Sequence, residues 1–401
     1  MTAVSRIVLL GSRADTIPLS AVARDTNAHA IVAAVPATLQ PGTYTVAWST
    51  AAADGHGARG SFTFTIESDA SVLSPKESTA STRASEKKPV RRINEAVQLA
   101  LGAPMWMARW LGFIALFFLI GAVSFRFVIL GRIPAPALEA DEAFRRIATT
   151  GAATAGMIAA VVITVGSVLK LYGETVAMQN VPARTILFAT SWGWAWLAEI
   201  AACVVAVVAF AIAHRTGTSR GTWPLAATCA FVLAATPALT GHAIASDDAL
   251  FAVPLDVLHV LAGSSWLGTL AVILFVGLGA AAKAPGSIST GPRLASLINA
   301  FSPLALMCGG AVVATGVATS LLHLEPISRL WTSTYGMTLI VKLALVSLLF
   351  SLGVWNWRRV KPNLGGEKGV LALRFSAKME LFASALVLAV TAFLVALPLP
   401  D

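Results

Sequence analysis

The sequence predicts a mostly α-helical membrane protein, with eight transmembrane helices preceded by a small all-β domain. Three observations support this prediction: 56% of the 401 residues are hydrophobic, only 12% are charged, and the apolar residues fall into long runs. A soluble globular domain has about 25% charged residues, so composition places this chain in a bilayer. The net charge of +9 is typical of loops beside membrane spans, and we expect no nucleic acid partner.

The β domain is predicted over residues 1–67. TYTVAW (43–48) and GSFTFTI (60–66) alternate β-branched and aromatic residues between Gly, Pro and Asp, as strands and turns do. Residues 68–95 are rich in Ser, Pro and Lys and lack an apolar period, so we expect a flexible linker. The membrane domain then occupies residues 96–401.

Eight apolar runs in the membrane domain are long enough to cross a bilayer, which takes about 20 residues. They are residues 106–130, 148–170, 187–213, 223–241, 250–280, 295–322, 337–357 and 378–399. Lys and Arg are distributed unequally between the two sides. One side has thirteen (Arg132, Arg145, Arg146, Arg215, Arg220, Lys283, Arg293, Arg358, Arg359, Lys361, Lys368, Arg374, Lys378) and the other three (Lys170, Arg184, Arg329). Positive loops face the cytoplasm, so we expect the N-terminal domain and the C-terminus outside it.

A group of ionisable residues lies around the start of the fifth span, in TGHAIASDDALFAVPLDVLHVLAG (240–263). Asp256 and His259 are three residues apart and share a helix face. His259 lies about 13 Å along the helix from the start of the span, a depth at which an ionisable residue is a functional candidate. His242 closes the fourth span, and His323 ends the sixth on the same outer face. Imidazole suits copper, zinc, iron and nickel, so the spacing predicts a metal site without naming the metal.

Two further charges fall inside predicted spans, Glu199 in the third and Lys342 in the seventh. Each could act as a proton or ion relay, or could form half of a buried structural pair. Trp266 is expected to lie at the membrane interface or to pack against other helices, rather than to line a cofactor site. The sequence has no phosphate-binding loop and no evident arrangement of nucleophile and base, so we do not expect an enzyme.

Residues 96–401 resemble the copper-resistance CopD family of bacterial inner-membrane proteins. The resemblance rests on GHA (241–243), DVLHVLAGSSWLGTL (256–270), TSTYGMTLIVK (332–342), GVWNWRRVKP (353–362), and Arg374 with Glu380. It implies that the metal is copper, as Cu(I) or Cu(II). It also implies that copper is bound at the outer face of a bacterial plasma membrane and passes inward across the lipid bilayer.

Residues 39–66, LQPGTYTVAWSTAAADGHGARGSFTFTI, resemble the closing hairpin of the CopC family. CopC proteins are copper-binding, cupredoxin-like β-sandwiches, often fused ahead of CopD. The resemblance implies that Asp54 and His56 help to hold Cu(II). The family's N-terminal histidine ligand and the opening part of its sandwich have no counterpart here, so we expect an incomplete domain.

Three functions remain open at this point. The first is a copper importer or copper-homeostasis protein, which the resemblance favours. The second is a haem-binding membrane redox protein, because histidines from adjacent helices could ligate a haem. The third is a copper-sensing scaffold that docks a periplasmic copper chaperone without transport.

Overall fold

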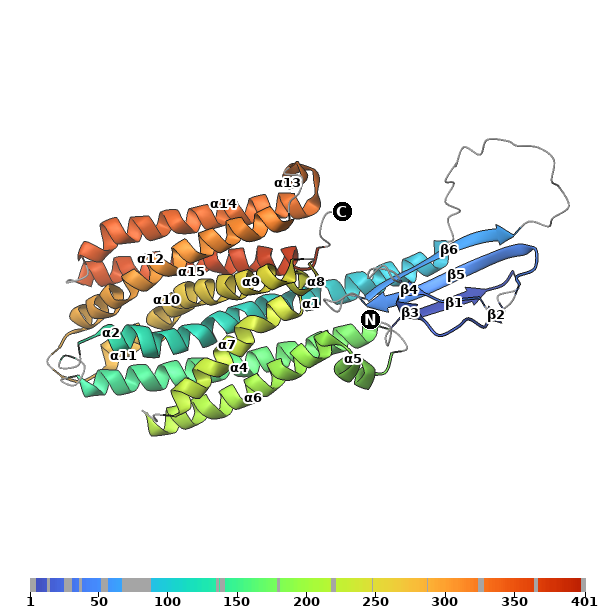
Figure 1. The fold of residues 1–401 in the computed structure, drawn as a ribbon. Coiled ribbons are helices and arrows are strands. Elements are labelled where there is room, and N and C mark those ends of the chain that lie inside the picture. The colour runs from blue at the N-terminus through green and yellow to red at the C-terminus, as the bar shows by residue number, and fades with distance from the viewer. Residues whose placement is uncertain are drawn as a thin grey trace. The chain divides into compact units, whose positions relative to one another are not determined.

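The computed structural model describes most of the chain (Figure 1). The described residues are 5–12, 15–24, 31–35, 38–51, 57–66, 88–134, 137, 141–178, 181–217, 221–246, 248–286, 288–323, 328–363 and 367–397. In a few of these, His242 and His323 among them, the backbone is described and the side chain is not. The chain divides into two compact units, Met1–Pro104 with Tyr172–Trp194, and Met105–Leu171 with Ala195–Asp401.

The first unit contains the predicted β domain. Its strands are β1 (Arg6–Leu10), β2 (Thr16–Ile17), β3 (Ala23–Arg24), β4 (Ile31–Val32), β5 (Gly42–Ala51) and β6 (Gly57–Ile66). They form an antiparallel sheet in the order β2-β1-β5-β6 and a separate β3-β4 ribbon. The β5–β6 hairpin pairs Gly42 with Ile66 and Ala51 with Gly57, which confirms the hairpin expected over 39–66.

Eight helices are long and apolar enough to cross a membrane in the described part of the chain, as predicted. They are Gly102–Arg132, Glu142–Ala177, Ser191–Thr216, Thr222–Leu239, Ala249–Lys283, Thr290–Leu321, Thr334–Val360 and Gly369–Leu394.

The elements that build them are α1 (Lys88–Ser124), η2 (Phe125–Ile129), α2 (Leu130–Arg132), α4 (Glu142–Ala177), α6 (Ser191–Thr216), α7 (Thr222–Leu239), α9 (Ala249–Gly263), η3 (Ser264–Gly268), α10 (Thr269–Val272), η4 (Ile273–Gly277), α11 (Leu278–Lys283), α12 (Thr290–His323), α14 (Thr334–Trp355), η5 (Asn356–Val360) and α15 (Glu367–Leu394). Short helices α5 (Ala183–Ala189), α8 (His242–Ala245), α13 (Arg329–Thr332) and η6 (Lys361–Asn363) connect them.

Several helices extend beyond the apolar runs that predict them. α1 begins at Lys88, inside the segment expected to be linker, and α15 begins at Glu367 rather than near 378. Lys170, assigned to a loop by the sequence, lies inside α4. The reason is common to all three: a helix can continue into the polar interface, where its residues need not be apolar, so hydropathy does not mark its end.

The first and fifth spans make the closest backbone contact of the second unit. A Cβ built on Gly268 would lie 1.9 Å from the carbonyl oxygen of Phe117, and one on Gly121 would lie 2.2 Å from the carbonyl carbon of Gly268. The close contact occurs at η3, a π-helical turn. α9, the N-terminal part of the fifth span, packs against α7, α8 and α12 (Figure 1).

Candidate functional site

Asp256 and His259 lie on α9, one turn apart, as their spacing predicts. Both side chains are half-buried. α9 begins at Ala249, after Asp248, and accommodates Pro254 within its early turns. The two residues therefore lie in the N-terminal half of the fifth span, with α12 packed alongside.

His259 forms hydrogen bonds to α12, with the Thr315 side chain and with the main chain of Val312. The imidazole Nδ1 lies 2.9 Å from Thr315 Oγ1, and Thr315 is buried. Thr315 donates its single hydroxyl hydrogen to the main-chain oxygen of Ala311, at 2.7 Å. In the tautomer protonated at Nδ1 the hydroxyl then accepts from His259 Nδ1–H, because a hydroxyl has one hydrogen. In the neutral ring this leaves Nε2 unprotonated, the form in which imidazole binds a metal.

The seventh span brings two polar residues toward the same site. Lys342 interacts electrostatically with both Asp256 and His259, and Tyr335 interacts with Asp256. Asp256 and Lys342 offset each other's charge, which lowers the cost of keeping either one in the bundle. Asp256 and His259 of the fifth span thus lie near two residues of the seventh span, Tyr335 and Lys342.

Of the remaining predicted ligands, the backbone is described for His242 and His323, and the side chain for none. His242 lies not on the fourth span but on α8, whose Ala243 packs with Ala252 of α9. His323 ends α12. Their side chains lie outside the described ones, as do Asp54 and His56 altogether. Among the residues whose side chains are described, no group of three His, Cys, Asp or Glu is arranged to hold a metal, so the six-residue ligand set stays a prediction.

Other residues of the fifth-span motif serve packing. Trp266 is buried and its ring lies 5.0 Å from that of Phe350, with Gly309 against both, which confirms the expected packing role. Gly268 is required by the close approach to Phe117 described above. The motif therefore combines two polar residues, Asp256 and His259, with two residues that hold the helices together.

Glu199 forms a buried ion pair with Lys170, which supports the structural reading of this residue. Lys170 Nζ lies 3.0 Å from Glu199 Oε2, and the Ser167 hydroxyl also donates to the Glu199 carboxylate. The Trp196 indole N–H donates to the Ser167 carbonyl oxygen at 2.8 Å. These bonds tie the second span to the third.

Replacing Lys170 by Met should destabilise the protein by about 2 kcal/mol. A fully buried pair broken on one side costs about 3–5 kcal/mol, and the Lys170 side chain is 40% exposed, which reduces the loss. Thermal unfolding in detergent measures it. Glu142→Gln is the control, because it breaks an exposed pair with Arg145 and should cost less than about 0.5 kcal/mol. Equal losses in the two variants would contradict the assignment.

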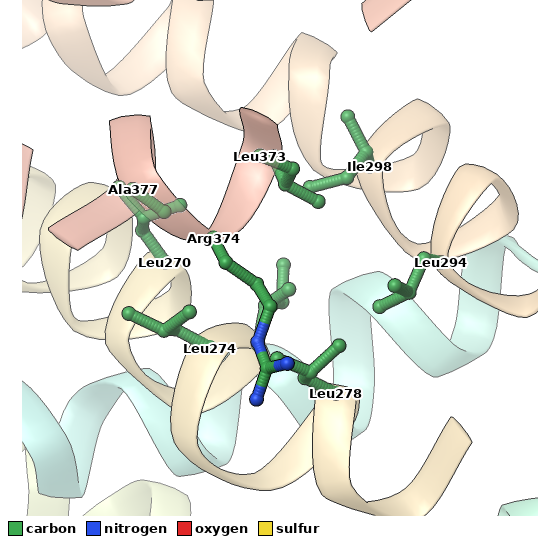
Figure 2. Close-up of a pocket in the computed structure, with 9 residues that line it drawn as sticks. Leu270, Leu274, Leu278, Leu294, Ile298, Leu373, Arg374 and Ala377 are labelled. Atoms are coloured by element: carbon green, nitrogen blue, oxygen red, sulfur yellow. The ribbon is translucent and has the colours of Figure 1, made fainter. Parts of the chain in front are cut away.

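A small pocket lies at the opposite end of the fifth, sixth and eighth spans (Figure 2). Its walls are apolar, and the one charged side chain is that of Arg374, which extends between Leu274 and Leu278. Arg374 and Glu380, paired in the sequence pattern, do not contact each other as an ion pair; Glu380 is bonded to Asn356 instead. The pocket offers no carboxylate, thiol or imidazole, so it is not a metal site.

Sequence reasoning missed Thr315 and gave Tyr335 no role. Nothing in the sequence marks Thr315 as a functional residue. Threonines within helices commonly bond the main chain of their own helix, as this one also does. Tyr335 belongs to the quoted span-seven pattern, and its spacing from Lys342 could have suggested a shared face.

Comparison with known proteins gives a consistent result. Residues 1–67 match the CopC domain, residues 100–252 the copper resistance protein D-like N-terminal domain, and residues 295–394 copper resistance protein D. The chain is 25% identical to the copper transport protein CutJ of Bacillus subtilis over 348 residues, 86% of this chain and 59% of that protein. The chain thus spans well under two thirds of that relative.

It is 27% identical to copper resistance protein D of Pseudomonas syringae pv. tomato over 253 residues, 60% of this chain and 79% of that one. No solved structure matches.

Proposed function

The chain belongs to the copper resistance protein D family and carries a CopC domain at its N-terminus, and from this premise we propose that it binds copper at the outer face of a bacterial plasma membrane and imports it. The observation that carries the proposal is the His259–Thr315 hydrogen bond, which leaves Nε2 available to a metal. In this role the protein is a carrier and not an enzyme.

The charges around His259 suit a site that holds a cation only in passing. Asp256 attracts an incoming copper ion, while Lys342 repels it and competes for Asp256. A conducting site must bind well enough to be entered and weakly enough to be left. His242 on α8 would add a second imidazole, because α8 packs on α9, and His323 at the end of α12 would extend the site outward.

The N-terminal domain would act ahead of this site. Asp54 and His56 fall between β5 and β6, where a CopC hairpin carries ligands, and would receive Cu(II) outside the cell or from a copper chaperone. This requires the N-terminal domain to lie outside the cytoplasm, as the distribution of Lys and Arg favours.

Thr315→Val should weaken copper binding about tenfold or more while leaving the fold intact. Valine matches threonine in shape but cannot accept the Nδ1 hydrogen, and loss of such an orienting partner costs about 10–100-fold in metal affinity. The affinity is measured by competition with a chelator of known strength, separately for Cu(I) and Cu(II). Thr315→Ser keeps the hydroxyl and should bind as wild type does. If the Val and Ser variants bound copper equally, Thr315 would not orient the ring.

The same preparations separate the two competing functions. A haem protein would show a Soret absorption band that is lost in His259→Ala. A scaffold would leave cellular copper unchanged by the protein's presence. We expect a colourless protein whose expression raises cellular copper.

A further inference from the structure

Two glutamates are buried in the membrane bundle, and their surroundings differ. Glu199 and Glu380 are each 4% exposed. Glu199 has the ammonium group of Lys170 3.0 Å away, whereas Glu380 forms no ion pair in the part of the chain that the structure describes. A carboxylate buried without a cation is costly in a bilayer, so Glu380 needs another means of neutralisation.

The partner that Glu380 does have is an amide. Asn356, on the π-helical turn η5 of the seventh span, donates from Nδ2 to Glu380 Oε1. The Asn356 Oδ1 atom is buried and accepts no hydrogen bond. The Ser384 hydroxyl, one turn along, gives its hydrogen to the Glu380 main-chain oxygen and so cannot serve Oδ1. The pair therefore lacks one donor.

A single proton supplies that donor. A protonated carboxyl has one O–H to give, and an amide oxygen accepts it. Facing acid and amide groups can then form a closed ring of two hydrogen bonds, Nδ2–H to Oε1 and carboxyl O–H to Oδ1. We propose that Glu380 and Asn356 form a proton-binding site inside the bundle, in which the neutral Glu380 carboxyl donates to Asn356 Oδ1.

The charged groups on the elements around Glu380 are consistent with a neutral carboxyl. On α15 itself Arg374 and Lys378 are exposed, and on η5 Arg358 and Arg359 are exposed. On η6, Lys361 donates to Ser302; on α12, Arg293 is held by Asp141; on α14, Lys342 faces Asp256. On α1, which also packs on α15, Arg109 donates to the main-chain oxygen of Ala392. The segments α10 and η4 carry no charge. Loss of the proton would break one hydrogen bond of the ring and place an unpaired charge between the seventh and eighth spans.

The test is infrared absorption of the full-length, metal-free protein in lipid nanodiscs at neutral pH. A protonated carboxyl has a carbonyl band well separated from that of a carboxylate, and the band shifts when exchangeable hydrogen is replaced by deuterium. We expect this band in the wild type, its loss in Glu380→Gln, and its retention in Glu199→Gln. A wild-type-minus-Glu380→Gln difference spectrum without an acid band would overturn the proposal.

A second variant, at Asn356, tests the hydrogen bond separately from the protonation of Glu380. Asn356→Leu removes the acceptor, so the acid band should persist and move to higher frequency; an unmoved band would refute the hydrogen-bonded ring. Glu380→Gln should unfold at the wild-type temperature, because glutamine keeps both hydrogen bonds without a charge, and a large loss of stability would also contradict the site. None of these measurements uses copper, so they succeed or fail independently of the proposed transport.

Discussion

His259→Ala is expected to weaken copper binding by the membrane domain at least about a hundredfold. His259 is the one predicted histidine ligand whose side chain is described, and in the tautomer protonated at Nδ1 its bond to Thr315 leaves Nε2 for the metal. Removing a ligand outright should exceed the 10–100-fold cost of removing a residue that only orients one. Equilibrium dialysis with elemental analysis gives the bound copper. The measurement is repeated with Asp54→Ala/His56→Ala added to each protein, so that copper bound by the hairpin is distinguished from copper bound by the membrane domain.

The matched control is His214→Ala. His214 Nδ1 also lies 2.9 Å from a threonine hydroxyl, that of Thr154, and Thr154 likewise donates to its own helix. His214 is exposed at the other end of the bundle. Its loss should leave copper binding unchanged. If both variants bound copper as tightly as wild type, His259 would not be a ligand.

Gly268→Ala is expected to prevent assembly of the membrane domain. Its new methyl group would meet the main-chain oxygen of Phe117 at 1.9 Å, and backbone cannot yield as a side chain can. Overpacking of a core costs about 1–3 kcal/mol, and more where the neighbour is rigid. The yield of monodisperse protein and its unfolding temperature measure the effect.

Gly279→Ala on α11 is the control for this substitution. No atom lies within 4 Å of the position of its Cβ, and alanine is favoured over glycine within a helix by about 1 kcal/mol. This variant should be as stable as wild type or slightly more so. A stable, correctly assembled Gly268→Ala protein would show that the first and fifth spans do not pack as described.

The architecture could be predicted from the sequence because membrane-spanning helices require long apolar runs, and half-buried strands require apolar and polar residues to alternate. These two patterns predicted the eight spans and the β5–β6 hairpin. They did not show that α1 begins at Lys88 or that α15 begins at Glu367, since helix ends in the polar interface follow no apolar rule. The shared helix face of Asp256 and His259 also follows from their spacing alone.

Contacts between helices could not be predicted in the same way. Thr315 reaches His259, and Asn356 reaches Glu380, only because particular helix faces are turned toward one another. That rotation depends on packing across the whole bundle, including the close approach of Gly121 and Gly268. Glu199 and Lys170 were each visible as charges, but their pairing depends on which faces of α4 and α6 are turned toward each other.

The most direct test of copper import through the outer site is cell-associated copper at fixed external copper. Elemental analysis would compare cells carrying wild type, His242→Ala/His259→Ala and an empty vector, with expression of the two proteins matched. We expect wild type alone to raise cellular copper and the double variant to match the vector. Equal copper in all three would contradict import, and copper raised equally by both proteins would contradict a role for these histidines.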